Sequence, residues 1–360
     1  MVILQIANIT NDKFSGVSVV VPEYLRYQSK YVNLAFLNTT NAKITGIINQ
    51  FNYQRSFKVV NLPKPFNKPD LVVFQEFYRK EYISISRELR DKNIPYLIIP
   101  HGELRKEAQE TKKIKKYIAN ATVFKPFING AIAIQCLSER EYENTLFGKS
   151  KFIIPNGVRI PERRKEVFSS DNIKFVYIGR LDYFVKGIDL LIEAIDSIRE
   201  IFEDNKCILD IYGPDKIGRA DHIQKLIKEA NLDGFVKLHN PVFGEAKERI
   251  LLDSDVFVQT SRFEGMPLGI LEAMSYGIPC LITKGTSLGE CVEQENAGWV
   301  AENTSESIAN SFLKCIKEKG RFSDYGMNGR KCINDRFSWN EITTKTIEMY
   351  KNLIDRSKAL

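Results

Sequence analysis

The chain has 360 residues, of which 43% are hydrophobic and 27% are charged, and its formal net charge is +7. This length predicts about two domains, and the composition is that of an ordinary soluble globular protein with an ample core. The modest positive charge does not by itself indicate a nucleic-acid partner, although it suits a partner that carries phosphate.

The first residues, MVILQIANIT, predict a strand and not a signal peptide, because they lack a basic flank, a long apolar region and a small-residue cleavage site. No run approaches the ~18 apolar residues that a membrane-spanning helix needs. The six cysteines are scattered, without a C-x-x-C pair or a histidine at metal-ligand spacing. We therefore expect reduced core thiols, and neither disulfides nor zinc ligands, in a cytoplasmic protein.

Short apolar runs alternate with helical patterns through the first half of the chain. Continuous apolar strands separated by helices are typical of a parallel sheet that is covered on both faces. Residues 81–93 predict an intervening helix, and residues 154–172, which contain Pro, Gly and charged residues, predict a linker. The predicted strands cover residues 2–8, 32–38, 71–76, 95–100 and 131–136.

A second alternating series follows the linker and predicts a second doubly wound unit. Its clearest helices cover residues 187–202 and 222–232, and residues 339–354 predict a C-terminal helix. Ligands of open parallel sheets bind beyond the carboxyl ends of the strands, so two facing units would place a site in the cleft between them. The predicted strands cover residues 173–180, 207–213, 236–240, 255–261 and 279–283.

Two cations follow the first strand of this second series. The strand ends at Gly179, Arg180 comes next, and Lys186 stands where a helix opens. Two cations at the carboxyl end of a strand, one of them beside a helix N-terminus, can neutralise a diphosphate. The simpler alternative is that both are surface cations on a loop, because exposed Lys and Arg are common.

Two residues of the first half also stand at predicted strand ends. His101 follows an apolar strand, where its imidazole could donate to a substrate hydroxyl or meet a developing charge, although a lone histidine is more often structural. Gly16 lies between the first strand and the first helix, where a missing side chain allows the backbone to approach a phosphate. It could equally be a turn glycine.

The sequence DSD at residues 253–255 has the form of a metal-binding D-x-D motif. Asp253 ends a predicted helix and Asp255 precedes a predicted strand, whereas a metal site is expected at the carboxyl end of a strand. We therefore expect no metal here. The sequence also lacks the G-x-S-x-G, H-E-x-x-H, Walker and G-x-G-x-x-G patterns. The motif residues that a hydrolase, an ATPase or a dinucleotide-binding protein of these types requires are therefore missing.

Residues 261–280, SRFEGMPLGILEAMSYGIPC, hold two glutamates eight positions apart. Glu264 lies in a loop rich in Gly and Pro, and Glu272 lies on a predicted helix. Together with Arg180, Lys186, the sequence PNGV and the terminal amphipathic helix, this stretch resembles the retaining glycosyltransferases of family 4, or glycosyltransferases group 1. The resemblance is strong from about residue 150 to 354 and weaker before it.

The resemblance implies the GT-B fold, in which two doubly wound Rossmann-like α/β domains face each other across a cleft. Residues 1–160 would form the acceptor-side domain, to which a helix at 341–360 returns, and residues 161–340 would bind a nucleotide-diphosphate sugar. The sugar, of hexose type, would pass to a glycan or lipid-linked glycan acceptor, with retention of configuration, in bacterial surface-polysaccharide biosynthesis. No metal or other cofactor is expected.

The resemblance also implies residue roles at matching positions. Glu272 would accept hydrogen bonds from the ribose hydroxyls of the donor, and Glu264 would face the donor sugar. Arg180 and Lys186 would stabilise the leaving diphosphate, and His101 would contact the donor sugar. The other donor-binding residues that it implies are Gly16, Gly179, Asn240, Val242, Gly265, Met266, Leu268 and Gly269.

Two other functions fit parts of the pattern. A nucleotide-sugar epimerase can share this architecture, but it should bring acidic and basic groups for proton abstraction, which the sequence does not identify. A degenerate subunit that only binds a partner would have substitutions at the charged residues of the donor motif. In this sequence the four charged residues of the motif are all present, namely Arg180, Lys186, Glu264 and Glu272.

Residues 111–127, TKKIKKYIANATVFKPF, predict a peripheral contact with an anionic membrane. Apolar residues share one helical stripe with lysines around it, a pattern that suits an interfacial helix and an acceptor carried on a lipid. In the alternative, the stripe packs on the domain core and the lysines are solvated. The stripe consists of Ile114, Tyr117, Ile118 and Ala121, and the lysines are Lys112, Lys113, Lys115 and Lys116.

Overall fold

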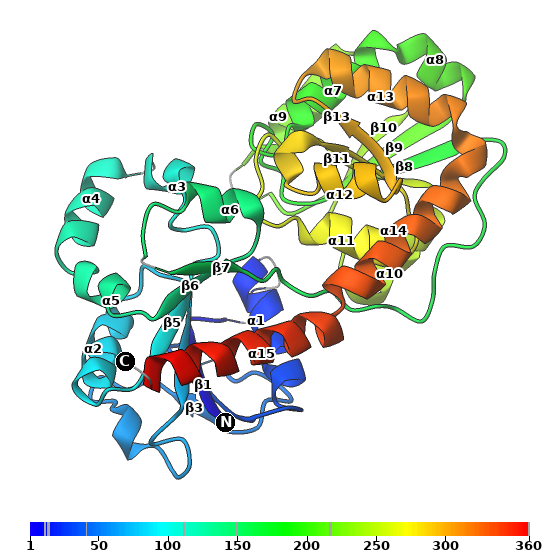
Figure 1. Ribbon diagram of the computed structural model, residues 1–360. Coiled ribbons are helices and arrows are strands. Elements are labelled where there is room, and N and C mark those ends of the chain that lie inside the picture. The colour runs from blue at the N-terminus through cyan, green and yellow to red at the C-terminus, as the bar shows by residue number, and fades with distance from the viewer. Residues whose placement is uncertain are drawn as a thin grey trace. The chain divides into compact units, whose positions relative to one another are not determined.

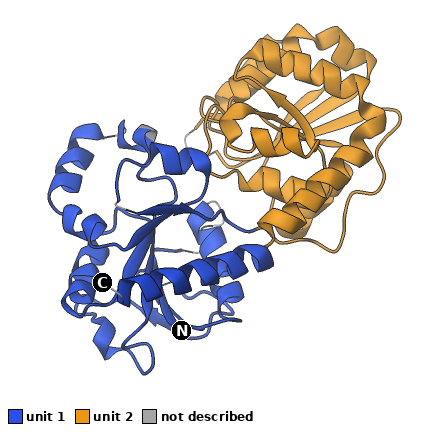
Figure 2. Ribbon diagram, in the orientation of Figure 1, with its two compact units in different colours: residues 1–157, 339–360 blue, residues 158–338 orange. Residues whose placement is uncertain are grey.

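The computed structural model describes residues 1–358 except residues 11, 13–14, 41, 111, 149 and 216–217. The chain divides into two compact units (Figure 2). Unit 1 comprises residues 1–157 and 339–360, and unit 2 comprises residues 158–338. Each unit is built on a parallel sheet with helices packed on it (Figure 1).

The sheet of unit 1 has the strand order β3-β2-β1-β4-β5-β6-β7. Its central strands are continuous apolar runs because both of their faces are buried, as the sequence predicted. The sequence missed the two edge strands, which are three residues long and only partly buried. The strands are β1 (Val2–Ala7), β2 (Asn33–Asn38), β3 (Gln50–Asn52), β4 (Leu71–Gln75), β5 (Tyr96–Ile99), β6 (Ala133–Cys136) and β7 (Lys151–Ile153).

The helices of unit 1 include one from the end of the chain. This helix, α15 (Trp339–Lys358), packs beside α1 (Gly16–Gln28), and its Trp339 ring meets Tyr24 edge-on with ring centroids 4.9 Å apart. Aromatic burial of this kind holds the C-terminal helix on unit 1. The remaining helices of unit 1 are η1 (Val59–Asn61), α2 (Lys80–Asp91), α3 (Lys106–Glu110), α4 (Lys113–Ala121), α5 (Lys125–Asn129) and α6 (Glu139–Asn144).

The sheet of unit 2 has the strand order β10-β9-β8-β11-β12-β13. Alternate residues of its strands enter two separate hydrophobic clusters, so both faces of the sheet are covered. The predicted doubly wound α/β architecture is therefore confirmed. The strands are β8 (Ile173–Ile178), β9 (Cys207–Tyr212), β10 (Val236–His239), β11 (Val256–Gln259), β12 (Cys280–Thr283) and β13 (Gly298–Ala301), of which the sequence missed β13.

One predicted helix of unit 2 is two helices. The backbone leaves the helical conformation at Ile198, with φ −121° and ψ 21°, where the Ile198 side chain is buried in the core. Residues 187–202 therefore form α7 (Ile188–Ser197) and α8 (Arg199–Asp204). The other helices of unit 2 are α9 (Ala220–Glu229), α10 (Gly244–Asp253), α11 (Leu268–Ser275), η2 (Lys284–Thr286), α12 (Gly289–Gln294), α13 (Ser305–Lys317), η3 (Lys319–Arg321) and α14 (Phe322–Phe337).

The strand order of each sheet reverses at one point, between β1 and β4 in unit 1 and between β8 and β11 in unit 2. Ligands of such sheets bind at this switch point, beyond the carboxyl ends of the strands. The loops after β8 and β11 carry the charged residues that the sequence singled out. None of the helices among the described residues is both long enough and apolar enough to span a membrane.

Candidate functional site

The loop after β8 carries both predicted cations. Arg180 is exposed, and within the described chain its side chain has no ion-pair partner. The hydroxyl of Tyr177 donates to the backbone oxygen of Arg180 at 2.9 Å, which fixes the backbone at this point. Lys186 is only 12% exposed and forms an ion pair with Glu264. The structure thus brings together Lys186 and Glu264, two residues that the sequence assigned to different parts of one ligand.

Glu264 is held by several further contacts at the carboxyl end of β11. Its Oε1 atom accepts hydrogen bonds from Gln259 Nε2 at 2.9 Å and from Ser261 Oγ at 3.1 Å. Its backbone N–H donates to Gly285 O at 2.9 Å, and its backbone oxygen accepts from Ser287 Oγ at 2.8 Å. Sequence reasoning missed Gln259 and Ser261, although a buried glutamine at the end of an apolar strand is a signal that a partner is near.

The loops after β8 and β11 are locked to each other. Gly187 has φ +64°, and a Cβ atom on it would lie 1.9 Å from Thr260 O, so this close approach requires glycine. The guanidinium of Arg262 binds both carboxylate oxygens of Asp189, at 2.7 and 2.8 Å. A bidentate pair of this kind is among the stronger ones. The position of Lys186 therefore depends on residues of both loops.

The helix α11 begins beside the end of β8. A Cβ atom on Gly269 would lie 3.4 Å from Ile178 O and 3.2 Å from Phe257 Cζ, so Gly269 lets the first turn pack on the sheet. No side chain caps this N-terminus, where Pro267 precedes Leu268. The first amide groups of a helix have no partner within it and attract anions. Gly265 and Met266, both partly buried, lie in the loop that leads into the helix.

Glu272 lies on α11, as predicted, and forms an ion pair with Lys247 of α10. The two side chains are 31% and 23% exposed, so this carboxylate remains within reach of a ligand. Lys247 could not be predicted from the sequence, because its contact with Glu272 depends on how α10 and α11 pack on one sheet.

The remaining predicted residues of unit 2 lie on neighbouring strand ends. Gly179 follows β8, and its backbone oxygen would be 1.8 Å from a Cβ on Gly213, so the ends of β8 and β9 approach closely. Asn240, exposed, and Val242, partly buried, follow β10. Beside them the ring of His239 stacks on Tyr212 with centroids 4.5 Å apart.

The two predicted residues of unit 1 lie after β5 and at the start of α1. His101 has a left-handed backbone, with φ +49°, and its Nε2 lies 2.7 Å from Gln75 Oε1. Because that oxygen can only accept, Nε2 carries the proton, and burial lowers the pKa of His101 to about 4. A Cβ atom on Gly16 would meet nothing within 4 Å, so packing does not explain this glycine.

Asp255 of the DSD motif is engaged by the chain itself. Its carboxylate forms an ion pair with Lys165 at 3.3 Å and accepts from the backbone N–H of Lys174 at 2.9 Å. Asp253 ends α10, as predicted. Among the described residues, no three His, Cys, Asp or Glu side chains lie close enough to hold a metal ion.

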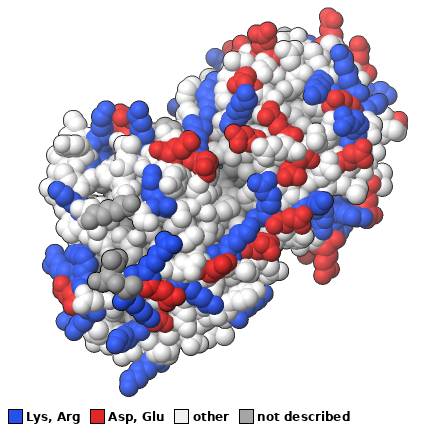
Figure 3. Space-filling model, in the orientation of Figure 1, with Lys and Arg blue, Asp and Glu red and all other residues white. Residues whose placement is uncertain are grey.

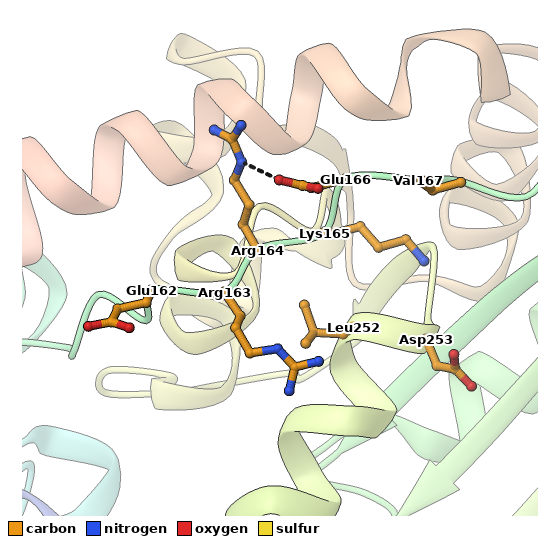
Figure 4. Close-up of a pocket in the computed structure, with 8 residues that line it drawn as sticks. All are labelled: Glu162, Arg163, Arg164, Lys165, Glu166, Val167, Leu252 and Asp253. Carbon is orange, nitrogen blue, oxygen red and sulfur yellow. Dashed lines mark ion pairs between the residues drawn. The ribbon is translucent and has the colours of Figure 1, made fainter.

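A polar pocket of about 560 Å³ lies near this motif (Figure 4). Residues 162–167 line it together with Leu252 and Asp253, and the ion pair between Arg164 and Glu166 spans 3.5 Å. Because Asp253 lies just before β11 begins, this pocket is at the amino ends of the strands. It is therefore separate from the residues that gather at the carboxyl ends of β8 and β11.

The unit that contains the Lys186–Glu264 pair also matches a known family. The family model of the glycosyl transferases group 1 matches residues 158–332. This segment belongs to the glycosyl transferases group 1. The group 1 segment lies wholly within unit 2 and includes β8, β11 and α11.

Curated relatives align over more of the chain than the family model does. The poly(ribitol-phosphate) alpha-N-acetylglucosaminyltransferase of Staphylococcus aureus (strain COL) is 27% identical over 261 residues, which cover 71% of this chain and 50% of the relative. The chain spans about half the length of the first curated relatives that it matches.

Solved structures match nearly the whole chain. Sucrose-phosphate synthase from Thermosynechococcus elongatus gives a TM-score of 0.73 at 18% identity and covers 98% of this chain and 100% of its own. Anabaena HepE in complex with UDP-glucose gives a TM-score of 0.72 at 16% identity, and the match covers 97% of this chain and 99% of the HepE chain. Likeness at this level of identity shows the fold, which is GT-B as the resemblance implied.

Proposed function

We propose that the chain is a glycosyltransferase that moves a sugar from a nucleotide-diphosphate sugar to a glycan or lipid-linked glycan acceptor. The observation that carries this proposal is that two cations and an uncapped helix N-terminus lie at the switch point of unit 2. Arg180, Lys186 and the uncapped N-terminus of α11 all lie at the ends of β8 and β11. The family of residues 158–332 supports the same activity.

In the proposed mechanism, Arg180 and Lys186 stabilise negative charge as it grows on the leaving diphosphate, together with the first amide groups of α11. Lys186 is paired with Glu264 in the free protein. When the diphosphate binds, Lys186 gains a second anionic partner, and the Glu264 carboxylate can accept hydrogen bonds from the donor sugar. The buried donors Gln259 and Ser261 keep that carboxylate in place.

At the nucleoside end, Glu272 accepts hydrogen bonds from the two ribose hydroxyls, and Lys247 orients its carboxylate. The base lies near Asn240 and Val242. His101 of unit 1 serves the donor sugar, and its unprotonated Nδ1 can accept a hydrogen bond. The charge of the diphosphate is neutralised by side chains and helix amides, so we expect transferase activity to persist in EDTA. Loss of activity in EDTA, with recovery when manganese is added, would contradict this expectation.

Retention of configuration and a role in bacterial surface polysaccharide complete the proposal. Retention is supported by the resemblance of the donor motif to the retaining family, and the surface role by the relative that acts on poly(ribitol-phosphate). The anomeric proton signal of the product, compared with that of the donor, reports retention directly. A product of inverted configuration would overturn that part of the proposal.

The test of donor binding is a thermal-shift screen of UDP-, GDP-, ADP- and CMP-sugars with the full chain. A donor at 100 times its dissociation constant should stabilise the protein by about 2.7 kcal/mol. We expect one nucleotide class to raise the melting temperature. If none of them raises it, the proposal of a nucleotide-sugar donor fails.

We also propose a peripheral contact between α4 and an anionic membrane. The apolar stripe of α4 faces solvent, with Ile114 and Tyr117 each 75% exposed, so the alternative in which it packs on the core is wrong. The inward side of α4 carries Ala119, which packs on the core of unit 1, beside two polar residues: Asn120 Oδ1 accepts from Tyr78 OH at 3.1 Å, and Lys116 Nζ donates to Ala108 O at 2.6 Å. Lys116 is therefore not part of the outer face.

The outer face of α4 combines apolar and cationic residues, the pattern of an interfacial helix. Ile118 and Val123 extend the apolar surface, and Lys112 and Lys115 lie exposed beside it. Figure 3 shows Lys and Arg atoms beside uncharged surface in this part of unit 1. Residue 111, the first of the predicted segment, lies outside the described residues.

Vesicle co-sedimentation tests this contact. The wild-type protein should pellet with phosphatidylglycerol-containing vesicles at low ionic strength, because each lysine near an anionic surface contributes about 1 kcal/mol. Ile114→Ser with Tyr117→Ser should abolish pelleting. The matched control is Ile48→Ser, another exposed apolar residue of unit 1, which should pellet normally. Failure of the wild type to pellet would exclude the membrane and favour a soluble acceptor.

A further inference from the structure

Two cysteines of unit 2 lie in contact, far from each other in the sequence. Cys291 on α12 and Cys332 on α14 have their Sγ atoms 3.1 Å apart. Cys332 is buried, whereas Cys291 is partly exposed and so departs from the expectation of a core thiol. This pair could not be predicted from the sequence, because it depends on the packing of α12 and α14.

The surroundings of the pair favour reaction at Cys291. The hydrogen bond between the two sulfur atoms and the nearby guanidinium of Arg336 both lower the pKa of Cys291. The pKa of Cys332 is raised, because the same hydrogen bond and burial hold its proton. The thiolate is the nucleophile in thiol chemistry, so the partly exposed Cys291 would react first and Cys332 would follow.

The two helices hold different parts of the candidate donor site. α12 follows η2, whose Gly285 accepts a hydrogen bond from the backbone of Glu264 at 2.9 Å. α14 packs on the end of α11, the helix of Glu272: a Cβ atom on Gly326 would lie 2.0 Å from Gly277 O, and Arg330 donates to Ser275 O. A bond between α12 and α14 would therefore join the supports of the two glutamates.

We propose that Cys291 and Cys332 are a redox-active pair that a small-molecule disulfide converts into an intramolecular disulfide, which restrains α12 and η2 against α14. The Cys291 thiolate attacks one sulfur of the oxidant, forms a mixed disulfide and releases one thiolate. Cys332 loses its proton to solvent and attacks Cys291 Sγ, which releases the second thiolate. The chain loses two electrons, and the oxidant is reduced to two thiols.

The test is a thiol count on the full chain after incubation with oxidised glutathione. Two of the six thiols should disappear, and peptide mass mapping should join the peptides of Cys291 and Cys332. Cys291→Ser should lose none of its remaining thiols. Cys136→Ala, which removes a buried thiol of unit 1, should still form the disulfide. Six intact thiols in the wild type, or a disulfide between other cysteines, would overturn the proposal.

The restraint itself is measured by hydrogen exchange. Amides of residues 284–294 should exchange more slowly in the oxidised protein than in the reduced one, and Cys291→Ser should show no difference between the two treatments. Formation of the disulfide without slower exchange in η2 and α12 would contradict the restraint. Neither readout requires nucleotide binding, so failure here is distinguishable from failure of the proposed transferase function.

Discussion

At the scale of single residues, the central feature of the candidate site is the ion pair between Lys186 and Glu264. Both side chains are largely buried, at 12% and 15% exposure, and the carboxylate also accepts from Gln259 and Ser261. A buried charge that loses its partner is destabilising, whereas removal of both charges is much less so. The pair is thus a structural support as well as a candidate ligand for the donor.

Lys186→Met should therefore lower the free energy of unfolding by about 1–3 kcal/mol, because it leaves the Glu264 carboxylate without its cation. Adding Glu264→Gln should restore part of that loss, with a coupling of about 0.5–3 kcal/mol. Urea unfolding of the two single variants and the double variant measures this coupling. Strict additivity would show that the two side chains do not interact in solution.

His101 makes a prediction about pH. Burial lowers its pKa to about 4, whereas the unfolded chain has a histidine pKa of about 6.5. The unfolded chain therefore binds this proton at a higher pH than the folded chain does. The contribution of neutral His101 to the free energy of unfolding is fully present above about pH 6.5 and is lost as the pH falls toward 4. His101→Gln should show a smaller loss of unfolding free energy over this interval.

Nuclear magnetic resonance can check the same residue directly, because the chain contains only three histidines. The His101 ring should stay neutral down to about pH 5 and carry its proton on Nε2, opposite Gln75 Oε1. A ring that titrates at the ordinary pH of an exposed histidine would contradict the buried environment described for His101.

At the scale of elements, backbone contact between the loops after β8 and β11 determines where the charged side chains of the site lie. Gly187 is the clearest example, since its positive φ and its contact with Thr260 O exclude a side chain. The same packing brings Lys186, which precedes Gly187, against the loop after β11. Substitution at this glycine should disturb the whole arrangement.

Gly187→Ala should destabilise the protein by about 2–4 kcal/mol, which combines the strain of a left-handed backbone with overpacking. Gly234→Ala is the matched control, because a Cβ atom there would meet nothing within 4 Å. That variant should stay within about 0.5 kcal/mol of the wild type. Equal melting temperatures for both variants would show that the close approach at Gly187 is not present in solution.

At the scale of the whole molecule, the sequence predicted what depends on local pattern. The buried strands of both sheets and the positions of Glu264 and Glu272 relative to α11 follow from apolar runs and helical spacing. The edge strands β3 and β7 escaped because they are short and half-buried. The pairing of Lys186 with Glu264, 78 residues apart, could not be predicted, because it arises from the adjacency of β8 and β11 in the sheet.

Other features escaped for the same reason. Lys247 meets Glu272, and Cys291 meets Cys332, only because helices distant in the sequence pack on one sheet. The solvent-facing stripe of α4 shows the converse. The sequence shows its helical period, but periodicity does not tell which side of a helix faces the core, and here the side that carries Lys116, Ala119 and Asn120 does.

The most direct measurement is a calorimetric titration of the full chain with the nucleoside diphosphate that the thermal-shift screen selects. The wild type should bind it, and Glu272→Ala should bind about tenfold or more weakly, since it loses charge-assisted hydrogen bonds worth about 1.5–3 kcal/mol. Glu200→Ala, an exposed glutamate of α8, should bind like the wild type. An unchanged affinity in Glu272→Ala would contradict the assignment of the donor to the switch point of unit 2.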